Sequence, residues 1–107
     1  MRKVNKIVIH CTATKEGNNV SPATIKKWHL NRGFSDIGYH YIIGIEGKIN
    51  AGRPVSRAGA HVKNGNSDSI GISYVGGLDS NGKAKDTRTD AQKASLIKIL
   101  KVLKNIY

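Results

Sequence analysis

Cysteine, proline and aromatic residues are scarce in the sequence. Its 107 residues include one cysteine, two prolines, one tryptophan, four tyrosines and one phenylalanine. A lone Cys11 forms no internal disulfide, which excludes a small disulfide-stapled scaffold and favours a reducing compartment. The apolar run Ile7–Ile9 is too short for a signal-peptide core, and no run is long enough to span a membrane. We therefore expect a protein that is made and held in the cytoplasm.

Acidic residues are also scarce. Seven Asp and Glu oppose 18 Lys and Arg, so the formal net charge is +11 and the sequence pI is about 10.1. This charge favours polyanionic neighbours such as nucleic acid, anionic lipid surfaces and bacterial cell walls, and it also keeps a protein soluble. The basic residues are scattered rather than clustered with aromatics, so nucleic acid is the least favoured partner.

The length predicts one domain that spans residues 1–107, because 107 residues leave no room for a second core. Hydrophobic residues make up 38% of the chain, and there are 12 glycines. Many glycines indicate tight turns and close backbone approaches, which are more typical of a mixed α/β domain than of a helical bundle. We find no internal repeat and no interdomain linker.

The N-terminal part of the chain predicts a strand, a loop and a helix. The continuous apolar run Lys6–His10 is typical of a strand that is covered on both faces. A polar, glycine-containing loop follows. Ser21 and Pro22 predict the start of a helix, because serine caps exposed amides and proline suits the first helical position. The segment Asn31–Gly33 predicts its end.

The rest of the chain predicts a hairpin, a long loop, a central strand and a second helix. The hairpin turns at Glu46–Lys48, and the irregular segment 51–69 follows it. The alternation in 70–75 is typical of a central strand, and Asp79–Gly82 predicts a turn. Thr89–Gln92 has the form of a capping box, and apolar residues at helical spacing follow it to the end.

The candidate metal ligands are four histidines and one cysteine, without any close pair at metal-binding spacing: His10, His29, His40, His61 and Cys11. Adjacent strand residues point to opposite faces, so at most one of His10 and Cys11 is a ligand to a given ion. His10 is the better candidate because it ends a strand and opens into a loop. Cys11 is equally well explained as a small buried hydrophobe.

Two of these histidines are interpreted as structural. His29 and His40 lie beside bulky aromatic residues, and we expect both to be packed and hydrogen-bonded rather than to bind a metal. Trp28, the neighbour of His29, is assigned to the core.

Five segments, in this order, carry a resemblance to a known family: residues 7–14 (IVIHCTAT), 28–29 (WH), 38–43 (GYHYII), 59–61 (GAH) and 69–72 (SIGI). Together they resemble the zinc-dependent N-acetylmuramoyl-L-alanine amidases of the phage-lysozyme type, which share their fold with peptidoglycan recognition proteins. The resemblance covers essentially all of the chain. It implies an α/β fold with a mixed central sheet flanked by helices and a zinc ion at the floor of a peptidoglycan groove.

The resemblance also implies roles for individual residues. His10 matches the first zinc ligand, and Tyr39 matches the active-site tyrosine, whose phenol would hydrogen-bond the attacking water or the oxyanion. His61 matches a groove-lining position that contacts glycan or the leaving amine, and Asn66 and Ser69 match polar positions at the groove edge. Ordinary explanations stay open: a strand aromatic for Tyr39, a surface histidine for His61 and hydrogen bonds within the loop for Asn66 and Ser69.

The sequence departs from this family at its end. Full-length members continue past the long helix with a second zinc-binding histidine, a catalytic lysine and a cysteine ligand, and no residue here matches them. A catalytic zinc needs three protein ligands. Three explanations are open. The chain is a fragment of a longer amidase, a shortened homologue without catalysis, or a protein that takes zinc ligands from another chain. We favour the first. A missing strand would expose a sheet edge and favour an oligomer or a swapped assembly.

The expected function is that of a prophage endolysin, a hydrolase that cleaves the amide between N-acetylmuramoyl and L-alanine in peptidoglycan. Such a protein stays in the cytoplasm until lysis or a holin releases it to the cell wall. The alternative is a noncatalytic peptidoglycan-binding module or an inactive fragment of such an amidase.

Overall fold

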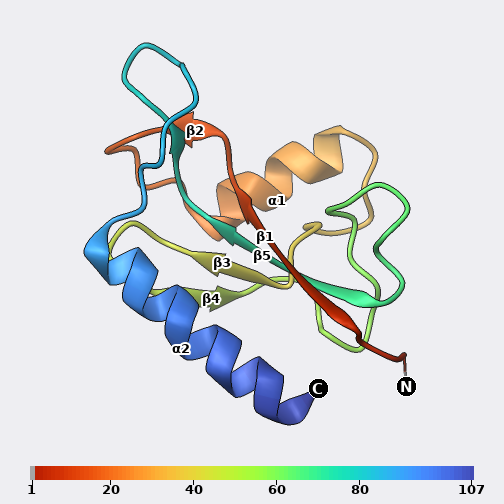
Figure 1. The fold of residues 1–107 in the computed structure, drawn as a ribbon. Coiled ribbons are helices and arrows are strands. Elements are labelled where there is room, and N and C mark those ends of the chain that lie inside the picture. The colour runs from red at the N-terminus through yellow and green to blue at the C-terminus, as the bar shows by residue number, and fades with distance from the viewer. Residues whose placement is uncertain (1) are drawn as a thin grey trace.

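A four-stranded sheet forms the centre of the fold, with helices on both of its faces (Figure 1). The computed structural model describes residues 2–107. The elements in chain order are β1 (Lys6–Cys11), β2 (Thr14–Lys15), α1 (Pro22–Asn31), β3 (Tyr41–Ile43), β4 (Ile49–Ala51), β5 (Ser69–Tyr74), β6 (Gly77–Leu78) and α2 (Asp90–Ile106). The strand order is β1-β5-β3-β4, with β1 and β3 parallel to β5 and β4 antiparallel to β3. The predicted mixed central sheet is confirmed.

Alternation along β5 gives the sheet two different faces. Ile70 and Ile72 pack with Leu96, Ile99 and Leu103 of α2 in one buried cluster. On the opposite face, Ile42, Val75, Ile25, Ile37 and Val20 form a second cluster beneath α1. Ser69, Gly71 and Ser73 share this second face with Val75 because side chains two positions apart point the same way. A row of small side chains therefore lies on the α1 side of the central strand.

Both helices begin where the sequence predicts. The Ser21 hydroxyl accepts a hydrogen bond from the Thr24 amide, and Pro22 occupies the first turn of α1. The Thr89 hydroxyl accepts from the Gln92 amide at 3.0 Å, and the Gln92 side chain accepts from the Thr89 amide at 3.0 Å, so the capping box is complete. Such reciprocal caps satisfy amides that a helix end leaves without partners.

Gln92 also joins α2 to the sheet. Its side chain is completely buried and donates to the carbonyls of Val75 at 2.9 Å and Ile43 at 3.3 Å. The sequence identifies Gln92 only as part of the cap. The sequence does not reveal this second role, because one carbonyl belongs to β3 and the other to the residue that follows β5.

The predicted turns are present. Gly47 has a φ of +89° in the turn between β3 and β4, a conformation that glycine adopts without steric cost. The Gly82 amide donates to the Asp79 carbonyl at 3.0 Å, which closes the predicted turn. The short pair β2 and β6 was not predicted, because two-residue strands carry too little alternation to be recognised.

Two expectations about burial are wrong. Within the described residues β1 is not covered on both faces, because none of its six residues is fully buried. Ile9 is 45% exposed because α2 packs against β3 rather than over this part of β1. Trp28 is 43% exposed rather than part of the core, because Ile25 and His29, one turn apart, form the buried stripe of α1. Trp28 lies at the margin of that stripe.

Neither helix in residues 2–107 combines the length and the apolar character that a membrane-spanning helix requires.

Candidate active site

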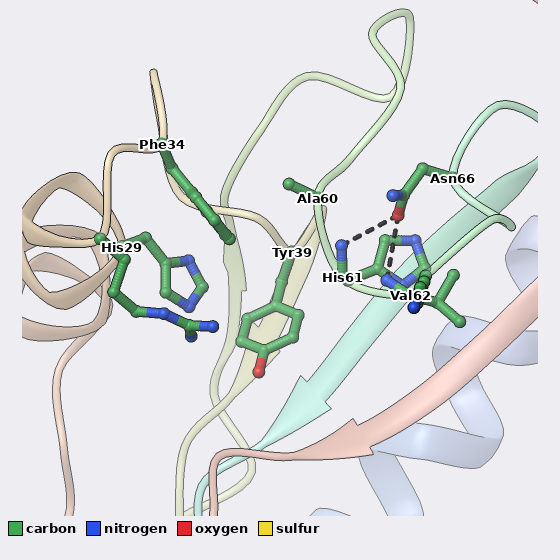
Figure 2. Close-up of a pocket in the computed structure, with 9 residues that line it drawn as sticks. His29, Phe34, Tyr39, Ala60, His61, Val62 and Asn66 are labelled. Carbon is green, nitrogen blue, oxygen red and sulfur yellow. Dashed lines mark hydrogen bonds between the residues drawn. The ribbon is translucent and has the colours of Figure 1, made fainter.

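A groove lies between the end of α1 and the long loop that precedes β5. It encloses a cavity of about 330 Å³, and Figure 2 shows most of its lining side chains. The lining residues are His29, Arg32, Phe34, Tyr39, Ala60, His61, Val62, Lys63 and Asn66. Two of them are cationic and none is acidic, so the cavity favours a ligand with negative charge.

His10 lies beside this cavity on β1. Parallel pairing places it opposite Ser73 of β5, on the sheet face that carries the small side chains. Its Nε2 atom is 2.8 Å from Nδ1 of His61, and its ring centroid is 5.7 Å from that of Tyr39. Burial lowers the pKa of His10, because a partly desolvated imidazole disfavours the charged form. The structure thus brings together the two residues to which the resemblance assigns metal binding and catalysis.

Contacts with Asn66 and Ser69 hold His61 in position. Asn66 Oδ1 accepts from the His61 amide at 2.9 Å and from the Val62 amide at 3.0 Å, as Figure 2 shows. His61 Nε2 is 3.1 Å from Ser69 Oγ. Burial, followed by the proximity of His10, lowers the pKa of His61 to about 4. His61 is therefore a neutral imidazole at pH 7.

The three residues expected to bind substrate occupy different positions. His61 and Asn66 line the cavity, whereas Ser69 is completely buried beneath His61. The Ser69 hydroxyl is 2.6 Å from the Gly65 carbonyl as well as 3.1 Å from His61. In this structure Ser69 affects the groove through His61, not from the groove surface.

Tyr39 stands between His10 and His29. Its ring centroid is 5.3 Å from that of His29, and its hydroxyl points away from Phe34 and Ala60 (Figure 2). Burial raises the pKa of the Tyr39 phenol, so it stays protonated and able to donate a hydrogen bond at neutral pH. A protonated phenol beside an imidazole is a suitable donor to a developing oxyanion.

Ser73 is a buried polar residue that the sequence analysis missed. It is completely buried and lies close enough to the Tyr39 phenol for their hydroxyls to interact, which opposes the effect of burial on the pKa of Tyr39. Buried polar atoms nearly always have partners, and Tyr39 is the candidate partner of Ser73. The only available signal was the spacing of Ser69, Gly71 and Ser73 along one face of the central strand.

The expectation that His29 and His40 are packed and hydrogen-bonded is confirmed. His29 Nδ1 accepts from the Gly38 amide at 2.8 Å, and His40 Nδ1 accepts from the Gly71 amide at 3.0 Å. His40 Nε2 donates to the Arg57 carbonyl at 2.8 Å. Both side chains are buried, and burial lowers both pKa values.

Arg53 holds the groove loop in place and was also missed. It is only 8% exposed and donates to the carbonyls of Ile37 at 3.0 Å, Ala58 at 2.9 Å and Asp36 at 3.3 Å. An arginine in a glycine-rich loop is most often solvent-exposed, so nothing in the sequence indicated that Arg53 is buried.

The described residues do not form a complete zinc site. A catalytic zinc needs three protein ligands, and no three His, Cys, Asp or Glu side chains in residues 2–107 lie close enough to share a metal ion. Cys11 follows His10 but lies on the other face of β1, where its sulfur packs against Gly77. Of the potential ligands, His10 alone matches a position for which the resemblance implies zinc binding.

The fold and the groove define an α/β domain that presents an imidazole and a phenol beside a cationic cavity. A family profile described as N-acetylmuramoyl-L-alanine amidase matches residues 1–107. The chain belongs to this family.

Individual relatives agree with this assignment. The chain is 40% identical over 106 residues to an endolysin of Klebsiella phage KP32, covering 99% of this chain and 70% of that protein. It is 43% identical over 97 residues to the endolysin of Escherichia phage T7, covering 91% of this chain and 64% of that protein. Insect peptidoglycan recognition proteins are also relatives.

A solved structure shows the same architecture. The N-acetylmuramoyl-L-alanine amidase LysC from Clostridium intestinale superimposes with a TM-score of 0.85 at 35% identity, covering 99% of this chain and 66% of that chain. The chain thus spans about two thirds of the length of these relatives.

Proposed function

We propose that the chain binds bacterial peptidoglycan in the cationic groove and contributes His10 and Tyr39 to hydrolysis of the amide between N-acetylmuramoyl and L-alanine. One observation carries this proposal: the ring centroids of His10 and Tyr39 are 5.7 Å apart, and Tyr39 lines the cavity. Membership of the amidase family supports the reaction class.

The groove suits an anionic peptide attached to a glycan. Arg32 and Lys63 offer positive charge to the carboxylates of a stem peptide, and Phe34 and Tyr39 offer flat apolar surfaces to sugar rings or aliphatic side chains. His61 and Asn66 line the same cavity and are proposed substrate contacts, with Ser69 supporting His61 from below.

In the proposed reaction, Tyr39 donates its phenolic proton in a hydrogen bond to the oxygen of the scissile amide as negative charge develops there. The raised pKa of Tyr39 keeps that proton in place at neutral pH. Zinc is the cofactor that the resemblance implies. His10 is the proposed first ligand, and two ligands beyond those in residues 2–107 are needed to complete the site.

The second candidate function is peptidoglycan binding without hydrolysis. The cavity and its cationic lining support it, because neither depends on a metal. For either function we propose that the protein acts as a prophage endolysin does. It would remain in the cytoplasm until lysis or a holin releases it to the cell wall. An oligomer or a swapped assembly would be one source of the missing ligands.

One set of measurements on the purified chain separates these functions. Zinc content, sedimentation with insoluble peptidoglycan and release of peptides with a free L-alanine amino group are measured for the wild type and for His10→Ala. About one zinc per chain, lost in the variant together with peptide release, supports the amidase. Sedimentation without zinc or release supports the binding module, and failure to sediment would overturn both.

A further inference from the structure

A chain of hydrogen bonds connects His10 to the groove loop, and its first link fixes the position of a proton. Ser69 Oγ is 2.6 Å from the carbonyl oxygen of Gly65. A carbonyl oxygen only accepts, so the single hydroxyl proton of Ser69 points at Gly65. Two oxygens at this distance without a proton between them would repel each other.

The second link follows from the first. Ser69 Oγ is also 3.1 Å from His61 Nε2, and its only proton is already committed to Gly65. Ser69 must therefore accept in this contact, which means that His61 carries a proton on Nε2. No carboxylate in the described residues forms an ion pair with His61, and a neutral imidazole that carries its proton on Nε2 has a free lone pair on Nδ1.

The third link extends the argument to His10. His61 Nδ1 lies 2.8 Å from His10 Nε2 and has no proton to give. His10 Nε2 must therefore be the donor. Neutral His10 then keeps an unprotonated Nδ1, with which no group in the described chain forms a hydrogen bond.

We propose that Ser69 and His61 are positioning residues that hold His10 as the Nε2–H tautomer, so that Nδ1 is the nitrogen that His10 offers to a ligand. A histidine that binds a metal commonly donates its other ring N–H to a fixed acceptor, which sets both tautomer and ring orientation. Here that acceptor is a second imidazole, which the loop anchors at Gly65. The tautomer of His10 is independent of the proposed function. Only the identity of the ligand that Nδ1 would bind rests on that function.

Two features of the fold support this arrangement. Gly71 lies under the His61 ring, where any larger residue would displace it. Asn66 Oδ1 accepts from the amides of His61 and Val62 and thereby fixes the backbone that carries the ring. The row of small residues on β5 thus provides the space in which His61 reaches both Ser69 and His10.

The experiment is long-range ¹H–¹⁵N NMR of histidine side chains at pH 7, in the absence of metal and substrate. In the wild type we expect His10 and His61 each to show one tautomer, protonated at Nε2. In Ser69→Ala, His61 loses the acceptor for its Nε2 proton, so we expect both rings to show mixed tautomers. Ser67→Ala, an exposed serine in the same loop, is the matched control and should resemble the wild type.

A wild-type His10 protonated at Nδ1 would overturn the proposal, whatever the variants show. It would also be overturned if folded Ser69→Ala kept the wild-type tautomers at both rings. Because the tautomers are measured without substrate, a failure of the proposed amidase function leaves their outcome unaffected.

Discussion

The imidazole of His61 lies against Gly71 so closely that a methyl group on Gly71 would sit 2.5 Å from the ring carbon Cγ. Gly71 belongs to the central strand and needs no unusual backbone conformation. Glycine is required at this position for space alone. The geometry of the groove therefore depends on the absence of a side chain as much as on the side chains that line it.

Replacing Gly71 with alanine should displace His61 from its position over β5. Overpacking of a buried site costs about 1–3 kcal/mol, which should appear as a lower urea midpoint. Gly44→Ala is the matched control, because the nearest atom to the added methyl group there is 3.4 Å away. Equal losses in the two variants would contradict the proposed steric role of Gly71.

Removing the Thr89 hydroxyl should destabilise the fold at the start of α2. Thr89 Oγ1 accepts from the Gln92 amide and donates to the Ile45 carbonyl at 2.7 Å, so Thr89→Ala loses a cap and a link to the hairpin. We expect a loss of about 1–2 kcal/mol in the free energy of unfolding. Ser80→Ala, in an exposed turn, should leave that free energy almost unchanged.

Stability should fall as the pH is lowered from about 6.5 toward 4. Burial lowers the pKa of His10, His29 and His40, and that of His61 to about 4, whereas an unfolded chain has histidine pKa values near 6.5. In this window the unfolded chain binds more protons, so protonation favours unfolding, and the contribution is fully present above pH 6.5. Urea unfolding at pH 7 and pH 5 measures the effect. A higher midpoint at pH 5 would refute it.

Neutralising the cations of the groove should weaken peptidoglycan binding. Arg32 and Lys63 line the cavity, and an exposed ion pair contributes about 0.2–1 kcal/mol, so Arg32→Gln with Lys63→Gln should raise the dissociation constant by about 2- to 30-fold. The loss should shrink at high salt because ions screen such pairs. Lys101→Gln on the exposed face of α2 is the control, and a similar loss there would indicate binding by net charge alone.

Arg53→Met should destabilise the groove loop although it keeps much of the side-chain volume. The variant leaves three carbonyls without their donor, those of Ile37, Ala58 and Asp36. An unsatisfied buried polar group costs about 1–3 kcal/mol, so the urea midpoint should fall well below the wild-type value. Hydrogen exchange should speed up at the Ala60 amide, which bonds to Gly38 across the loop. An unchanged rate at Ala60 would argue against this role.

Local chemistry made much of the fold predictable. Ser21 with Pro22, Gly47 and the Thr89 capping box act over a few residues, so their structures follow from short segments. Trp28 and Ile9 were misplaced because burial depends on which neighbour covers a position, and that neighbour is distant in sequence.

The candidate site was predictable only in part. His10 and Tyr39 could be selected from the motifs, and the structure places them side by side. The positions of Ser69 under His61, of Ser73 opposite His10 and of Arg53 beneath the loop depend on strand register and loop path, which no short segment encodes.

The parallel pairing of β1 with β5 sets the order in which the site can form during folding. Lys6 pairs with Ser69 and Cys11 with Tyr74, whereas Ile43 pairs with Ile49 across a short turn. Closing the longer loop costs more chain entropy, so the hairpin is expected to form before β1 joins the sheet. His10 travels with β1. His10 and His61 therefore come together only once the long loop has closed, so the imidazole pair is expected to form later than the hairpin.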